Sequence, residues 1–204
     1  MPVYIGQAEL SFEDPEADWN SKLRAVGLMI ACHRRIERFI AVLVDLAMRV
    51  HWSALTKTES GALETALRYF RDVAPHHTAD EESGLFPNLE QPYGGSISYL
   101  SDLERDHRRA ERLHCTVHRL GLIWRRQVTL DDSNVAKVQS ALADLSTLYR
   151  EHIRIEEQQV FPCARTALSR GVLKRIGGDM ASRRGVAYIP PTVRTIATAQ
   201  METP

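Results

Sequence analysis

Two segments of the chain repeat one pattern of residues at the same offsets. The first is HTADEESGLFP, from His77 to Pro87, and the second is HIRIEEQQVFP, from His152 to Pro162. Both read His-x-x-x-Glu-Glu-x-x-aliphatic-Phe-Pro. Residues four apart lie on one face of an α-helix, so each histidine and the first glutamate after it can point to the same place. The pattern predicts two helices with equivalent polar groups on their inner faces.

A second repeated motif lies upstream of each segment. HRRIERF begins at His33, 44 residues before His77, and HRRAERL begins at His107, 45 residues before His152. The chain therefore reads as two helical hairpins of similar design. Each hairpin carries one histidine on its first helix and His-x-x-x-Glu on its second, so the repeat predicts approximate two-fold symmetry.

Apolar residues recur at three- and four-residue intervals over long stretches, and no stretch alternates as a strand would. We therefore predict the all-α class, as an up-down-up-down four-helix bundle with short connections. Pro75 is expected to kink or interrupt the second helix. The predicted helices cover residues 20–50, 58–86, 98–126 and 134–169. By domain, we expect an N-terminal arm over 1–19, the bundle over 20–170, and a short helix and C-terminal tail over 171–204.

Composition excludes several classes of protein. Lys+Arg and Asp+Glu both number 26 in 204 residues, so no net charge favours a generic nucleic-acid or membrane-surface binder. No apolar run is long enough to span a membrane, and the start lacks the features of a signal peptide. The separated cysteines Cys32, Cys115 and Cys163 do not form a disulfide framework or zinc ribbon. We expect a cytoplasmic protein with no nucleic-acid or membrane partner.

The repeated histidines and glutamates predict a site for two metal ions. Burying this many ionisable groups without partners would cost several kcal/mol for each unpaired charge, and cations remove that cost. Two histidines per metal and two carboxylates shared by both metals give four protein donors to each, and a bridging oxide or hydroxide makes five. Such donors suit iron, manganese or zinc. The Phe86 and Phe161 rings are expected to pack beside the site. The predicted ligands are His33, His77, Glu81, His107, His152 and Glu156.

These motifs resemble the hemerythrin-like (HHE cation-binding) family over residues 20–170. The resemblance implies a four-helix bundle with a non-haem di-iron centre: two iron ions joined by an oxo or hydroxo bridge, with the same six ligands. The oxygen carriers differ, with His-x-x-x-His on the third helix, where His107 is here followed by Glu111, and His-x-x-x-x-Asp on the fourth. The pattern is closer to relatives implicated in iron-centre repair, nitric oxide or peroxide chemistry, and iron or oxygen sensing.

Other polar residues lie near the predicted ligands. Glu37 and Glu111 follow His33 and His107 by four residues and are expected to face the same interior, as extra ligands, proton relays or partners of nearby arginines. Tyr149 is either an ordinary core tyrosine or a hydrogen-bond donor to a metal-bound oxygen species. No catalytic residue is assigned.

Four further residues carry chemistry without a settled role. His76 projects about 100° from its neighbour in a helix and is expected at the surface or behind the ligands. His114, Cys115 and His118 extend the face of the third helix, either as an access path or secondary site, or as polar residues of a helix seam.

The resulting prediction is a di-iron protein that binds or senses a small oxidant such as oxygen or nitric oxide. Two alternatives remain: an oxidoreductase acting on peroxide, and an iron donor for damaged iron centres. A ferritin-like site is excluded, because Glu104-x-x-His107 and Glu111-x-x-His114 both fall on the third helix, whereas that site takes such motifs from two helices.

Overall fold

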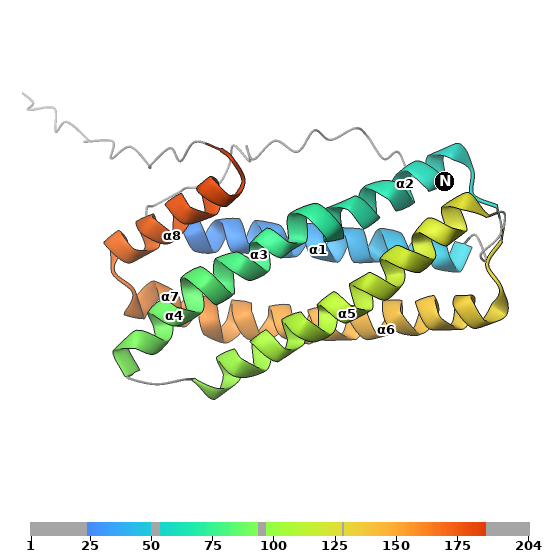
Figure 1. Ribbon diagram of the computed structural model, residues 1–204. Coiled ribbons are helices and arrows are strands. Elements are labelled where there is room, and N and C mark those ends of the chain that lie inside the picture. Colours follow the sequence, from blue (N-terminus) through green and yellow to red (C-terminus); the bar gives the residue numbers. More distant parts are fainter. Residues whose placement is uncertain (1–23, 50–53, 94–96, 128, 187–204) are drawn as a thin grey trace, which may run out of the picture.

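The computed structural model describes residues 24–49, 54–93, 97–127 and 129–186. These residues form helices joined by short connections, and no strand occurs among them (Figure 1). The predicted all-α class is therefore confirmed. The predicted arm over 1–19 and the last part of the tail, 187–204, lie outside the described residues. No helix in the described ranges is long and apolar enough to cross a membrane.

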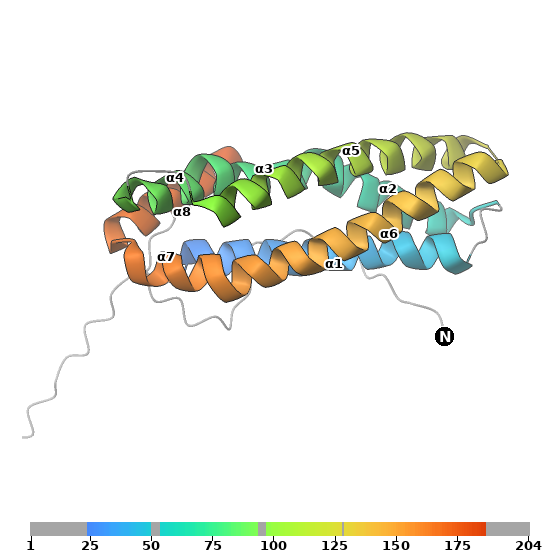
Figure 2. The ribbon, with the colours of Figure 1, turned by 90° about the horizontal axis from the view of Figure 1, so that it is seen from below.

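Several helical elements join end to end into longer rods. α2, η1, α3, η2 and α4 follow one another without a break, and so do α6, η4 and α7 (Figures 1 and 2). The α-helices are α1 (Arg24–Arg49), α2 (Lys57–Arg68), α3 (Ala74–Asp80), α4 (Phe86–Glu90), α5 (Ser98–Arg126), α6 (Asp132–Ile155), α7 (Phe161–Ala167) and α8 (Arg170–Arg183). The π-helical turns are η1 (Tyr69–Val73), η2 (Glu81–Leu85) and η4 (Glu156–Val160), and η3 (Gln91–Tyr93) is a 3₁₀ turn.

The rods pack side by side around one interior. α1 contacts α2 and α6, and α5 contacts the same two helices from the other side. α8 lies over one end, against α1, α3 and η2 (Figure 1). The rod of α6, η4 and α7 ends at Ala167, two residues earlier than predicted. It ends there because the Ser169 side chain accepts a hydrogen bond from the Val172 amide and starts α8.

Each π-helical turn ends two residues before a proline. Pro75 follows η1, Pro87 follows η2 and Pro162 follows η4. A proline inside an α-helix has no N–H to donate, and its ring clashes with the carbonyl one turn back. A wider π turn accommodates that clash without ending the helix. The break expected at Pro75 is therefore a π turn, and the repeated Glu-Glu-x-x-x-Phe-Pro sequence produces the same turn in both hairpins.

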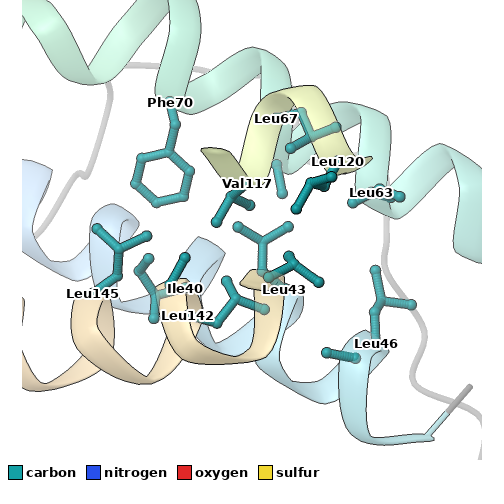
Figure 3. Packing of buried hydrophobic residues seen from close by; sticks show 14 of the residues in the cluster. Ile40, Leu43, Leu46, Leu63, Leu67, Phe70, Val117, Leu120, Leu142 and Leu145 are labelled. Atoms are coloured by element: carbon teal, nitrogen blue, oxygen red, sulfur yellow. The ribbon is translucent and has the colours of Figure 1, made fainter. Parts of the chain in front are cut away.

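The apolar core is divided in two by a polar layer. Along α1, Met29 belongs to one buried cluster and Ile36 to the other, and His33 lies between them. The larger cluster fills the interior between α1, α2, α5 and α6 (Figure 3). The smaller one lies toward α4, α7 and α8 and contains Phe86 and Phe161. The two apolar clusters therefore enclose the predicted ligands from both ends.

Candidate metal centre

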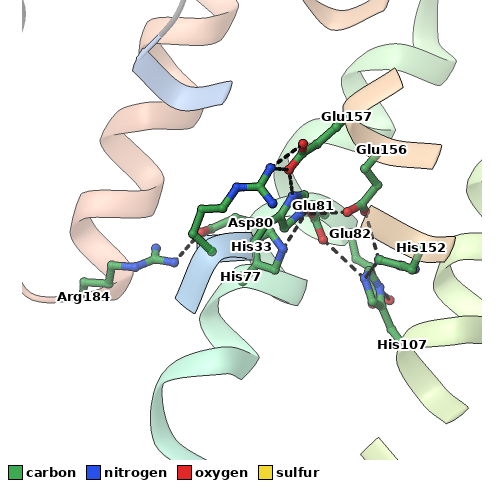
Figure 4. A network of polar contacts seen from close by, with 11 residues as sticks. His33, His77, Asp80, Glu81, Glu82, His107, His152, Glu156, Glu157 and Arg184 are labelled. Carbon is green, nitrogen blue, oxygen red and sulfur yellow. Dashed lines mark hydrogen bonds and ion pairs between the residues drawn. The ribbon is translucent and has the colours of Figure 1, made fainter. Parts of the chain in front are cut away.

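Six ionisable side chains from six helical elements meet in the polar layer (Figure 4). Each is at most 8% exposed, and Glu81, Glu156 and His33 are 0% exposed. The elements place them as follows: His33 on α1, His77 on α3, Glu81 at the start of η2, His107 on α5, His152 on α6, and Glu156 at the start of η4. The structure thus brings together all six residues predicted from the sequence.

Each buried carboxylate presents one oxygen to each hairpin. Glu81 Oε1 lies 3.3 Å from His77 Nε2 on its own rod, and Glu81 Oε2 lies 3.3 Å from His107 Nε2 on α5. Glu156 repeats this arrangement, with Oε1 3.1 Å from His152 Nε2 and Oε2 3.0 Å from His33 Nε2. Both glutamates therefore lie between the histidines of one hairpin and those of the other.

The donor atoms fall into two overlapping groups. One contains His33 and His77, the other His107 and His152, and both contain Glu81 and Glu156. Within each group the ligand atoms lie within 4.8 Å of one another. His107 Nε2 and His152 Nε2 are 3.0 Å apart, which is about the separation of two nitrogens at right angles around one ion at ~2.1 Å.

The hydrogen-bonding state of these atoms also fits a cation. Among the described residues, eight buried side-chain nitrogen and oxygen atoms lack a hydrogen bond, and seven of them belong to this cluster. They include both oxygens of Glu81 and of Glu156. Buried polar atoms are nearly always paired. Five of the seven, His33 Nε2 and the four carboxylate oxygens, face the space between the histidines, so this concentration indicates lone pairs that converge on a common centre.

Without a cation, burial and mutual contact shift the titration of the cluster. Burial and the nearby Glu156 carboxylate raise the pKa of Glu81 to about 7. Burial lowers the pKa of His152, but Glu156 and Asp106 outweigh it and raise that pKa to about 10. The same competition raises the pKa of His107 to about 9, through Glu81 and Glu82. Bound cations would replace these protons as the compensating positive charge.

The second glutamate of each Glu-Glu pair has a separate position behind a histidine. Glu157 Oε1 accepts a hydrogen bond from His33 Nδ1 at 2.9 Å, and Glu82 Oε1 accepts one from His107 Nδ1 at 2.8 Å. These bonds fix the tautomer that leaves Nε2 free to face the centre. Sequence reasoning selected Glu81 and Glu156 but missed this role. The repeat of the Glu-Glu pair was the available signal.

Aromatic rings and a buried ion pair complete the surroundings of the cluster. The Phe161 ring stacks on His33 at a centroid distance of 5.4 Å, and the Phe86 ring lies parallel to His107 at 6.4 Å. This confirms the predicted packing of both rings.

Asp80, next to Glu81 in the chain, is 0% exposed. Arg183 and Arg184 at the end of α8 donate hydrogen bonds to its two oxygens at 2.7 and 2.6 Å.

Two sequence predictions about nearby carboxylates are wrong. Glu37 and Glu111 were expected to face the interior, but both side chains are exposed. The alternative that they pair with nearby arginines is confirmed for Glu37, which accepts a hydrogen bond from Arg34. The buried stripe of α1 passes through Ile36 and Ile40, which leaves Glu37 on the solvent side of His33. His76 is half-buried and belongs to neither donor group.

A cavity of about 580 Å³ reaches the cluster from the side, and His114, Cys115 and His118 line it together with His107. Tyr149 also lines it, and its hydroxyl lies 2.9 Å from His114 Nε2. Burial lowers the pKa of His114 to about 4, so this imidazole is neutral at pH 7. Tyr149 is therefore hydrogen-bonded to His114 in the cavity wall.

A helical protein with two overlapping His/Glu donor groups in its interior is of the metal-binding class. Residues 24–164 match the hemerythrin HHE cation-binding domain, and the chain belongs to that family. It is also 28% identical over 170 residues to an uncharacterized protein of Haemophilus influenzae (strain ATCC 51907 / DSM 11121 / KW20 / Rd), over 83% of this chain and 94% of that protein.

Proposed function

We propose that this protein holds two iron ions in an up-down-up-down hemerythrin-like bundle and binds or senses a small oxidant such as oxygen or nitric oxide. His33 and His77 hold one ion, and His107 and His152 hold the other. Glu81 and Glu156 are shared between them. The observation that carries the proposal is the pair of overlapping donor groups, with both shared carboxylates buried and without hydrogen bonds.

The donor chemistry supports iron over most other cations. An imidazole and carboxylate mixture is typical of iron, manganese and zinc sites, whereas calcium and magnesium take oxygen donors and structural zinc usually takes thiolates. When bound, a pair of iron ions supplies one-electron chemistry and an open position for a diatomic ligand. The protein's own part is to orient the six donors, through Glu82 and Glu157, and to surround them with apolar walls.

The surroundings favour ligand binding over the two alternatives. Peroxide chemistry needs an acid or base near the reacting atoms, but Glu111 lines the cavity where it opens to solvent, and Tyr149 is hydrogen-bonded to His114. An iron donor must release its metal readily, yet the six donors are almost completely buried. Both features support a centre that retains its metal and receives a small ligand through the cavity.

Metal analysis with optical spectroscopy on protein from iron-supplemented cells tests the proposal. We expect about two irons per chain, near-ultraviolet absorption typical of an oxo-bridged iron pair, and a new band on exposure to oxygen or nitric oxide. Glu81→Ala and His152→Ala should each abolish these features. Glu64→Ala, which removes an exposed glutamate of α2 that pairs with Arg125, is the matched control and should keep them.

Three results would contradict the proposal. Protein that contains only zinc, or no metal, would remove the di-iron centre. Turnover of hydrogen peroxide that disappears in Glu81→Ala would favour the oxidoreductase instead. Transfer of iron to an apo acceptor within minutes would favour the iron donor.

A further inference from the structure

The cavity beside the cluster is much larger than a diatomic ligand requires. Its volume of about 580 Å³ falls in the range of pockets for organic ligands, roughly 300–1,000 Å³, whereas one water molecule takes about 30 Å³ of liquid. Its lining residues on α5 run from His107 to His118, a rise of about 16 Å along the helix axis. The cavity is therefore elongated along the bundle as well as large.

The wall changes character from one end of the cavity to the other. At one end are the imidazoles of His33, His77, His107 and His152. Away from the cluster the lining is mainly apolar and includes Leu43, Leu67, Phe70 and Val117, which belong to the larger apolar cluster shown in Figure 3. Three polar side chains lie on this part of the wall: the half-buried His118, and His114 with Tyr149, of which the last two are satisfied by their mutual hydrogen bond. An extended apolar group would therefore meet no unpaired polar atom of these last two side chains.

Exposed residues mark where the cavity opens. Arg71 on η1, together with Arg108, Glu111 and Cys115 on α5, line it and are exposed. The opening therefore lies between α5 and the rod that runs from α2 to α4. A molecule that enters there reaches the cluster in one direction and the apolar end in the other.

The cluster end selects the head group of a ligand. Two divalent cations carry a formal charge of +4, and Glu81 and Glu156 together supply −2. The six ligands alone therefore leave +2, and the Glu82 and Glu157 carboxylates behind His107 and His33 offset that charge from outside. Direct coordination then selects the head group, because an open position on either cation takes an anionic oxygen donor. This step rests on the proposed metal pair, whereas the size and apolar lining of the cavity do not.

We propose that the cavity binds an organic carboxylate with an extended apolar tail. The carboxylate reaches the metal centre, and the tail lies along Leu43, Leu67 and Val117. The carboxylate supplies the anionic oxygen, and the tail fills a volume that oxygen or nitric oxide leaves empty. Ligands of this class would thus share the centre with a small oxidant or compete with it.

A series of straight-chain carboxylates from acetate to decanoate tests the proposal by titration calorimetry, below micelle-forming concentrations. The full chain is used both metal-free and loaded with zinc, which is redox-inert, after its metal content is measured. Each added methylene that leaves water should tighten binding about fourfold, until the cavity is full. Zinc loading should tighten the binding of every acid by a similar factor, because the head group is the same throughout.

Variants locate the tail in the cavity. Val117→Phe places a larger ring in the apolar end, away from the predicted ligands. The increase in affinity with each methylene should then stop at a shorter acid, while the affinity for acetate stays unchanged. The matched control is Val135→Phe, on α6 at the edge of the same apolar cluster but outside the cavity lining. Its affinity should rise with chain length over the whole series, as in the unaltered protein. Thermal melts establish that both variants fold.

The outcomes separate this inference from the proposed function. Decanoate binding within threefold of acetate, with or without zinc, would overturn the carboxylate site, and so would equal effects of Val117→Phe and Val135→Phe. A chain-length series that zinc does not strengthen would overturn the placement of the head group at the metals. If the protein takes up no metal, the proposed function fails, while the metal-free series still decides whether the cavity receives an apolar tail.

Discussion

His33 on α1 donates a hydrogen bond from Nδ1 to Glu157 Oε1 at 2.9 Å, although the two residues are 124 positions apart in the chain. The equivalent bond in the other half joins His107 to Glu82. In each case the histidine comes from the first helix of one hairpin and the carboxylate from the second helix of the other. The orientation of each imidazole therefore depends on the docking of the two hairpins.

Removal of the charge behind His33 should weaken metal binding. Glu157→Gln keeps the shape of the side chain but removes the carboxylate that makes the imidazole more basic. Changes of this kind cost about 10- to 100-fold in metal affinity, and a chelator-competition titration measures the loss. Glu151→Gln alters an exposed surface glutamate and serves as control. Equal affinities for the two variants would show that Glu157 does not support the centre.

The buried ion pair at the end of α8 should contribute strongly to stability. Asp80→Asn removes a fully buried charge that Arg183 and Arg184 share, which leaves both guanidinium groups without their anion. Breaking a buried pair is costly, and with one arginine partly exposed we expect a loss of about 2–4 kcal/mol in urea unfolding. Asp102→Asn removes an exposed pair with Arg105 and should change stability by less than about 1 kcal/mol. A loss for Asp80→Asn no larger than this control would contradict the prediction.

His114 should make the folded state less stable in acid. Burial lowers its pKa from 6.5 to about 4, so below pH 6.5 the unfolded chain binds a proton that the folded protein does not. The free energy of unfolding therefore falls as pH drops from 6.5 toward 4, by up to about 3 kcal/mol. His114→Gln should remove this part of the pH dependence in chelator-treated protein. Tyr149→Phe leaves His114 buried and should retain it; a pH dependence unchanged in His114→Gln would contradict the assignment.

Metal removal should lower the melting temperature. A ligand that binds only the folded state, at a thousand times its dissociation constant, adds about 4 kcal/mol, which is about 10 °C for a chain of this size. Calorimetry before and after chelation measures the change, and added iron should restore the melting temperature. His152→Ala should show no such response. A wild-type melt that is insensitive to chelation would show that the cluster does not bind metal.

Helix spacing predicted the cluster well because each His–Glu pair lies within one turn of a single helix. His77 with Glu81, and His152 with Glu156, are one helical turn apart, and both pairs point inward. The same spacing failed for Glu37. Four residues rotate by about 400°, so this side chain lies about 40° beyond His33, and the neighbours of α1 bury the opposite flank through Ile36. Spacing specifies a shared face, but packing decides which edge of that face is covered.

The sequence by itself determined the all-helical class, the two equivalent hairpins, and which side chains share a helix face. These follow from backbone geometry within a few residues and from the apolar pattern. Only the tertiary structure decided that Glu82 supports His107, that Glu157 supports His33, and that α8 binds Asp80 through Arg184. Each of these contacts joins residues on different rods, and the docking of whole apolar faces sets their relative positions, which no local spacing encodes.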